Sequence, residues 1–412
     1  MPTSLYILLL VFITIALRQF IRTPIKIWHI MLVGAITALI TKQISLPHAW
    51  HAVHWPVIIY LFGVFLIGQT LEESGYLKKL SYHLLKNIKN PKRLMFYSVF
   101  IFALASSILM NDTIAIIGTS TILALTANRK ELLKPLLLAL AFSITLGSVL
   151  SPVGNPQNLL IASSSLFENA FLSFFIHFII PTLINLVATY FIVLFFYRDA
   201  FKLELIAPEK EPLLNKELAK TVKYSLALLV ALILLNFVLG IFQTKLQLPF
   251  VWIAIIACMP ILMHSNRLSL VKNIDWGSLV FFVAMFILIQ SVWDSGFFQH
   301  LLNETSISIG SLLSIFVISI LLSQFISNLP LVALYLPILI HLGANQQQLL
   351  ALSSGSTIAG NLLIMGAASN IIIIQSAEKR GANPFHFFEF LKIGLPLTFI
   401  NFMVYFINLH GS

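Results

Sequence analysis

Long apolar segments separated by short polar stretches run along the whole chain. A helix needs roughly 20 residues to cross the hydrocarbon core of a bilayer. Several segments are shorter and come in adjacent pairs, one divided by MNDT (110–113) and the other by SNLP (327–330). The segments are residues 4–20, 27–45, 56–71, 94–109, 114–127, 132–166, 171–197, 224–242, 249–263, 276–293, 307–326, 331–342, 349–377 and 393–408. This pattern predicts an all-α polytopic membrane protein in which each short pair forms a re-entrant hairpin.

The basic residues predict the orientation, because cytoplasmic loops are enriched in Lys and Arg. If both pairs are hairpins and every other segment crosses once, 23 of the 25 Lys and Arg residues lie inside, and only Lys42 and Lys245 lie outside. If either short pair crossed the membrane once instead of re-entering, every loop after it would lie on the opposite side and the excess of basic residues inside would be lost. The distribution therefore favours about ten transmembrane helices, two hairpins and both termini outside, in the inner membrane of a bacterium.

Composition excludes several classes of protein. The 412 residues are 58% hydrophobic and 10% charged, whereas soluble domains contain about 25% charged residues. The net charge of +10 belongs to the loops, so no basic soluble domain is left to bind nucleic acid. The single cysteine, Cys258, permits no internal disulfide, and the histidines lack metal-ligand spacing. Because no nucleophile–base motif is present either, we expect neither an enzyme nor a bound cofactor or structural metal.

The two halves of the chain resemble each other. GQTLEESGYLKKL (68–80) matches IQSVWDSGFFQHL (289–301), and TLGSVLSPVGNPQN (145–158) matches TIAGNLLIMGAASN (357–370). The tip Asn111-Asp112 matches Asn328-Leu329 in the same way. The charge distribution has the first hairpin entering from inside and the second from outside. We therefore predict two inverted repeats, residues 1–197 and 224–412, joined by a cytoplasmic linker at 198–223. Inverted repeats are typical of secondary transporters.

Prolines, glycines and asparagines interrupt one apolar segment in each half, as SPVGNPQN (151–158) and as GAASN (366–370). A backbone that leaves the helix in hydrocarbon loses several kcal/mol for each unpaired polar group. Such a break is tolerated where it lines a polar cavity and where side chains, water or a solute pair the freed groups. The sequence therefore predicts two broken helices around a site near the middle of the membrane.

Four motifs, MNDT, GNPQN, SNLP and GSTIAGNLLIMGAASN followed by AEKRG, together resemble the ion transporter superfamily. The likeness is greatest to its branch of arsenite permeases and NhaD-type sodium–proton antiporters, and it covers residues 56–381. It implies a transport domain of hairpins and broken helices that moves like an elevator against a scaffold domain, often in a homodimer. The divalent-anion symporters of the superfamily carry Ser-Asn-Thr at both tips. This chain does not, which disfavours a di- or tricarboxylate substrate.

Carried over by position, the resemblance implies a substrate and ion site on the two tips and the two breaks. Its residues are Asn111, Asp112, Thr113, Gly154, Asn155, Asn158, Ser327, Asn328, Gly366, Ser369 and Asn370. A sodium ion would lie near Asn111, Asp112 and Asn155. Asp112 is the only carboxylate expected deep in the membrane, where a charge is costly and usually functional. Alternatively, Asp112 only caps the second helix of its hairpin, and the asparagines only bridge their broken helices.

The expected chemistry is transport. Helix N-termini at tips and breaks can bind an anion or a neutral oxyacid, and freed carbonyl and amide oxygens can hold a cation such as sodium. We predict a secondary active transporter of a small inorganic or organic anion, or of a neutral oxyacid such as arsenite, coupled to sodium or protons. A sodium–proton antiporter is the alternative among transporters, and a channel would also use re-entrant hairpins.

Overall fold

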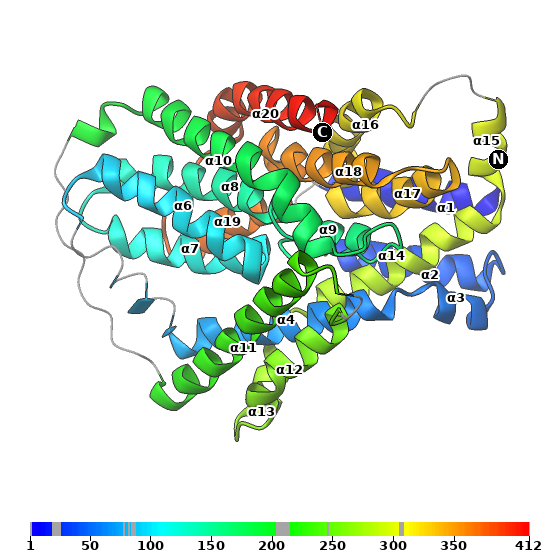
Figure 1. Ribbon diagram of the computed structural model, residues 1–412, viewed down its shortest axis with the longest axis horizontal. Coiled ribbons are helices and arrows are strands. Elements are labelled where there is room, and N and C mark those ends of the chain that lie inside the picture. The colour runs from blue at the N-terminus through cyan, green and yellow to red at the C-terminus, as the bar shows by residue number, and fades with distance from the viewer. Residues whose placement is uncertain are drawn as a thin grey trace.

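The computed structural model describes residues 2–18, 26–76, 79–80, 83, 88–202, 215–244, 247–304 and 309–411. Helices dominate this part of the chain, and it contains no β-strand, which confirms the predicted all-α fold (Figure 1). The α-helices are α1 (Thr3–Arg18), α2 (Ile27–Ile40), α3 (Leu46–Ala52), α4 (Trp55–Ser74), α6 (Pro91–Leu109), α7 (Asn111–Leu125), α8 (Leu133–Val149), α9 (Pro156–Ala162), α10 (Ala170–Phe196), α11 (Lys216–Ile241), α12 (Phe250–Leu262), α13 (Arg267–Asn273), α14 (Trp276–Asp294), α15 (Phe297–Glu304), α16 (Leu312–Ile326), α17 (Asn328–His341), α18 (Gln346–Ile358), α19 (Ala368–Glu378) and α20 (Phe387–His410). Short 3-10 helices are η1 (Lys130–Leu132), η2 (Ala200–Lys202), η3 (Ala359–Asn361) and η4 (Ile364–Gly366).

Among the described residues, seven segments are long and apolar enough to cross a membrane. They are α4, α6, η1 with α8, α10, α11, α14 and α20. Shorter apolar helices lie in α1, α2, α7, α12, α16 and α17. The chain is an integral membrane protein. Helix α6 is 19 residues long and could cross alone, although the sequence predicts it as a hairpin arm, so the number of crossings and the re-entrant path stay predictions.

Each predicted hairpin consists of two helices packed against each other and joined by a single kinked residue. Met110 between α6 and α7 has φ 66° and ψ 145°, and Ser327 between α16 and α17 has φ 69° and ψ 163°. This region of backbone conformation is nearly exclusive to glycine and costs of order 1–3 kcal/mol elsewhere. The two residues immediately precede Asn111 and Asn328, the tips that the sequence match aligns. Both tips therefore share one strained geometry.

Helices α4 and α14 also end alike. Gln69 Nε2 donates to Glu73 Oε1 at 2.8 Å, and Gln290 Nε2 donates to Asp294 Oδ1 at 2.7 Å. Gln69 and Gln290 occupy equivalent positions of the sequence match, as do the two carboxylates. The glutamines therefore donate hydrogen bonds to helix-end carboxylates, and they do not lie at the tips or breaks.

The helices divide into two groups. Helices α6–α10 and α16–α20 pack into one bundle, in which α7 packs on α19 and α17 packs on α9, so each hairpin contacts the broken helix of the other half. The second group consists of two sets of three helices: α4, α11 and α12 pack on one another, as do α1, α2 and α14, and α4 contacts α14. In Figure 1, α4, α11 and α12 run obliquely below the bundle. Arg380, just after α19, reaches Glu72 of α4 at 3.7 Å and links the two groups.

Candidate functional site

The first break is closed by its own side chains. Asn158 Nδ2 donates to the carbonyls of Ser148 at 3.0 Å and Ser151 at 3.2 Å, which replaces helix bonds lost where α8 ends. Asn158 Oδ1 accepts from Ser353 Oγ at 2.8 Å and from Thr357 Oγ1 at 3.3 Å, both on α18. All four hydrogen-bonding positions of this amide are therefore used, and the first break is fastened to the second broken helix.

Asn155 completes this closure. Its Oδ1 accepts from the backbone N–H of Asn158 at 2.8 Å and so caps α9. Its Nδ2 donates to Ser148 Oγ at 3.0 Å and to Thr357 Oγ1 at 3.2 Å. The first hairpin joins in, because the N–H of Asn111 donates to the carbonyl of Gly154 at 3.0 Å. Residues 151–162 are all buried, so the first half presents few free polar groups.

The second break keeps part of this arrangement and leaves the rest open. Asn370 Nδ2 donates to the carbonyl of Gly360 at 2.7 Å, which repeats the bond from Asn158 to Ser148, because each partner is 212 residues further along. Among the described residues, however, neither Asn370 Oδ1 nor Ser369 Oγ has a hydrogen-bond partner. Both side chains are fully buried. The same fold element is thus satisfied in the first half and has unpaired acceptors in the second.

Asn328 at the tip of the second hairpin lies beside this break. Its Nδ2 is 3.7 Å from the position that a Cβ on Gly360 would occupy, and its Oδ1 has no recorded partner. The neighbouring Ser327 is half-buried and carries the kink. The structure therefore brings Asn328, Gly366 and Asn370, three of the predicted residues, together around Gly360.

Gln324 on α16 belongs to the same region, and the sequence did not indicate it. Its Nε2 donates to the carbonyls of Ile320 at 2.7 Å and Ala359 at 2.9 Å. Its Oε1 has no recorded partner and lies 2.9 Å from the position of a Cβ on Gly366. The sequence did contain one signal for Gln324: it is a polar residue about one turn before the second tip, and Ser107 occupies the matched position before the first tip.

The first turns of α17 and α19 are open as well. A helix leaves its first N–H groups without an intrahelical acceptor, and neither α17 nor α19 has a side-chain cap. Helix α9, by contrast, is capped by Asn155. Ala368 at the start of α19 is exposed, and residues 362–365 are half-buried. The second break therefore combines free donors with buried free acceptors, beside a partly exposed stretch of backbone.

Asp112 lies on the first hairpin, within the first turn of α7. The hypothesis that Asp112 caps this helix is wrong, because the N-cap position is Met110 and Asp112 is the second residue of α7. The N–H of Asp112 itself donates to Asn111 Oδ1 at 3.0 Å. No hydrogen bond or ion pair is recorded for the carboxylate among the described residues, whereas Glu72 and Glu73 both have polar partners. The next residue, Thr113, packs on α4, where a Cβ on Gly68 would be 2.8 Å from its Cγ2. The carboxylate thus sits at the boundary between the two helix groups.

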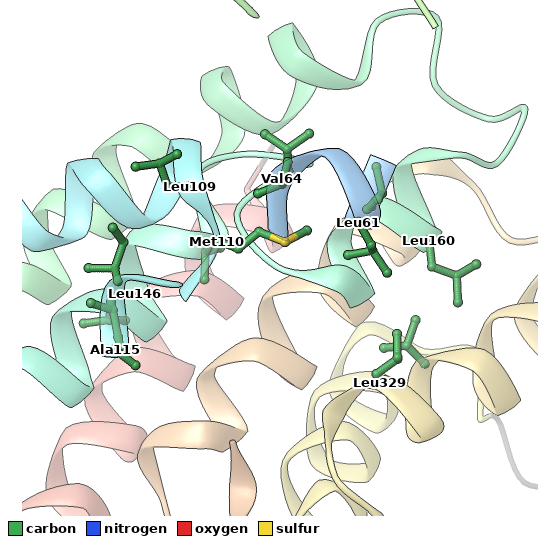
Figure 2. Close-up of a cluster of buried hydrophobic side chains, with 14 of the residues drawn as sticks. Leu61, Val64, Leu109, Met110, Ala115, Leu146, Leu160 and Leu329 are labelled. Atoms are coloured by element: carbon green, nitrogen blue, oxygen red, sulfur yellow. The ribbon is translucent and has the colours of Figure 1, made fainter. Parts of the chain in front are cut away.

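Apolar side chains surround the first tip. Figure 2 shows Met110 extending toward Leu61 and Val64 of α4, with Leu160 of α9 and Leu329 of α17 nearby. All of these side chains are buried. Methionine is flexible and adapts to changing neighbours. The contact between the first tip and α4 is therefore apolar, with one flexible side chain, Met110, at its centre.

Comparison with known sequences identifies the family. The profile of the family described as "Citrate transporter" (CitMHS) matches residues 9–349. The chain belongs to the citrate transporter family. The resemblance to the ion transporter superfamily is thereby confirmed, and the protein is a membrane transporter rather than an enzyme.

Two relatives and one solved structure extend this result. The chain is 27% identical to a 46 kDa membrane protein of Mycobacterium leprae, covering 85% of this chain and 84% of the relative. It is 24% identical to the silicon efflux transporter LSI3 of Oryza sativa subsp. japonica, covering 90% and 89%. The YdaH transporter of Alcanivorax borkumensis aligns with a TM-score of 0.55 at 14% identity, covering 92% and 86%. This last likeness concerns the fold alone.

Proposed function

We propose that this member of the citrate transporter family is a secondary active transporter of a small inorganic or organic anion, or of a neutral oxyacid such as arsenite. Its solute site would be the second break together with the second tip. The observation that carries this proposal is the set of unpaired polar groups there, formed by Asn328, Ser369, Asn370 and the uncapped starts of α17 and α19. Buried polar groups are normally paired, so a bound solute would supply the missing partners.

Sodium or protons would drive the transport, with Asp112 as the coupling residue. A carboxylate within a membrane-embedded bundle is costly unless it binds a proton or a cation. In the described part of the chain the carboxylate of Asp112 has no polar partner. Asn111 precedes it on the same tip, and this tip bonds to the break that carries Asn155, through Gly154. The same observation favours the second candidate function, a sodium–proton antiporter, in which these ions would be the only transported species.

An elevator-like movement would expose the site alternately to the two sides. The bundle of α6–α10 and α16–α20 would slide against α4 and the helices packed with it. The apolar contact around Met110 and the half-exposed ion pair between Arg380 and Glu72 support this, because neither resists sliding strongly. Exposed ion pairs contribute about 0–1 kcal/mol. We also propose a homodimer in the inner membrane of a bacterium, with both termini outside.

The name of the rice relative, a silicon efflux transporter, supports a neutral oxyacid over a carboxylate. The family description points instead to citrate. The tips MNDT and SNLP lack the Ser-Asn-Thr of the divalent-anion symporters that the sequence resembles. We therefore rank small oxyacids first and carboxylates second.

Uptake into proteoliposomes tests the proposal. Purified protein would be reconstituted with imposed sodium or proton gradients, and uptake of radiolabelled arsenite, phosphate and citrate would be measured beside sodium and proton fluxes. We expect saturable, gradient-driven uptake of at least one solute, without single-channel currents. Movement of sodium and protons alone would contradict the proposal in favour of the antiporter.

A further inference from the structure

The hydrogen bonds of Gln324 and Asn370 show which atom of each side-chain amide donates and which accepts. Gln324 Nε2 donates to two backbone carbonyls, of Ile320 and Ala359, and Asn370 Nδ2 donates to the carbonyl of Gly360. A carbonyl oxygen only accepts, so the amide nitrogen must face it in each case. The opposite atoms, Gln324 Oε1 and Asn370 Oδ1, are therefore acceptors, and neither has a recorded donor.

The amides that carry these two acceptors bind consecutive carbonyls of one short backbone segment, those of Ala359 and Gly360. A Cβ on Gly366 would be 2.9 Å from Gln324 Oε1 and 3.1 Å from Gly360 Cα, and Gly360 supplies the carbonyl that binds Asn370. Two glycines thus allow the amides to approach the same turn of the break. Asn370 is fully buried, so water at the protein surface does not satisfy its oxygen.

The same region also carries free donors. The first turns of α17 and α19 begin at the second tip and the second break without any side-chain cap. Their N–H groups suit an oxygen lone pair or a negative charge. A fully ionised oxyanion would accept hydrogen bonds from these donors, but its negative charge would be repelled by the two amide oxygens. A bare metal cation would pair with the oxygens and leave the N–H groups empty.

A ligand with both hydroxyl hydrogens and oxygen lone pairs satisfies both sets. We infer that the second break binds its solute as an undissociated oxyacid, whose O–H groups donate to Gln324 Oε1 and Asn370 Oδ1. Its oxygens accept from the N–H groups of the first two residues of each helix, Asn328 and Leu329 in α17 and Ala368 and Ser369 in α19. This inference rests on the proposed transport of a small solute, and it makes Gln324 a specificity-determining residue for the neutral form.

Binding to purified protein in lipid nanodiscs tests the inference with three probes at neutral pH: arsenous acid, which is undissociated there, the anion arsenate, and sodium alone. We expect arsenous acid to bind the wild-type protein and arsenate to compete poorly. Gln324→Met keeps the length of the side chain and removes its hydrogen bonds, so it should weaken arsenous acid binding by about tenfold or more. Ser107→Ala, the matched position of the first half, should change binding by less than about twofold, because Ser107 Oγ is satisfied by the carbonyl of Leu104.

Three outcomes would overturn the inference. Arsenate binding as well as or better than arsenous acid to the wild-type protein would show that the site selects the anion, and this comparison needs no variant to fold. Arsenous acid binding equally to wild-type protein and a folded Gln324→Met variant would remove Gln324 from the site. If sodium alone bound to the wild-type protein and Gln324→Met abolished this binding, the two acceptors would belong to a cation site. Failure of the proposed function is distinct, because neither arsenic species would then bind or move while sodium and protons still exchange.

Discussion

At the scale of single residues, Asn158 and Asn370 show how one sequence position serves two purposes. Both donate to the carbonyl at the matched position of their broken helix, Ser148 in one half and Gly360 in the other. Only Asn158 has its oxygen occupied, by Ser353 and Thr357 of the other half. Asn158 therefore has a mainly structural role, and Asn370 has an unpaired acceptor that can bind a solute.

This difference predicts unequal effects of the same substitution. Asn158→Ala removes four hydrogen bonds and strands buried partners, so it should lower the free energy of unfolding by about 2–4 kcal/mol. Asn370→Ala removes one recorded bond and should cost about 1 kcal/mol while cutting solute transport by about tenfold or more. Thermal unfolding in detergent beside proteoliposome uptake measures both. Equal destabilisation by the two variants would contradict the assignment of roles.

The second prediction at this scale concerns Asp112. Asp112→Asn keeps the size of the side chain but cannot exchange a proton for sodium, so ion-driven accumulation of solute should fall to the passive level. Equilibrium binding of the solute should change by less than about threefold, because the solute site is placed on the other half. Uptake would be compared across sodium and pH gradients. Unchanged ion dependence would move the coupling to backbone carbonyls at the breaks.

At the scale of helices, close backbone approach holds the first hairpin to its broken helix. A Cβ on Gly147 of α8 would lie 2.1 Å from the carbonyl oxygen of Ala103 on α6. Ser106 Oγ adds a bond of 2.7 Å to the carbonyl of Ile144. Backbone atoms cannot rotate away as a flexible side chain can. The spacing between α6 and α8 therefore depends on the absence of a side chain at residue 147.

Gly147→Ala should force α6 and α8 apart and lower the free energy of unfolding by about 3 kcal/mol. Gly310→Ala is the matched control, because the nearest atom to its Cβ would be Gln348 Nε2 at 3.6 Å, an ordinary contact distance. Monodisperse yield and thermal unfolding in detergent would be compared. A Gly147→Ala protein as stable as Gly310→Ala would show that the helices can shift without cost.

Local pattern predicted these helical elements well and their polar details less well. The segments on either side of MNDT and SNLP became α6 with α7 and α16 with α17, since apolar runs and polar tips are local signals. The short helices α3, α13 and α15 were not predicted, because seven or eight residues give little periodicity. Gln324 was missed because its importance depends on the carbonyl of Ala359, 35 residues away.

At the scale of the whole molecule, the repeat accounts for what the sequence could and could not predict. The matched offsets led to Asn158 and Asn370, and the strained tips at Met110 and Ser327 follow the same alignment. The asymmetry could not be predicted, because it comes from contacts between the halves. Ser353 and Thr357 satisfy the first break, and no equivalent pair of donors is recorded for Asn370 Oδ1 in the described part of the second.

The inverted arrangement itself gives the last prediction. If both hairpins re-enter, the start of α11 faces the cytoplasm and the start of α18 faces outside. Three crossings, by α11, α12 and α14, lie between these two points, and the second hairpin adds none. Single cysteines at Gln346 and Lys220 would be placed in a Cys258→Ala background, Cys258 being buried, and labelled with a membrane-impermeant maleimide in intact cells and in inverted vesicles. Gln346 is half-buried and Lys220 is exposed, each near its helix start. We expect the cysteine at 346 to react in cells and the cysteine at 220 only in inverted vesicles, with at least about fivefold selectivity for each.

Reaction of both from one side would mean that α16 and α17 together cross the membrane once instead of re-entering. The second tip would then no longer mirror the first, and the elevator-like movement would lose its geometric basis.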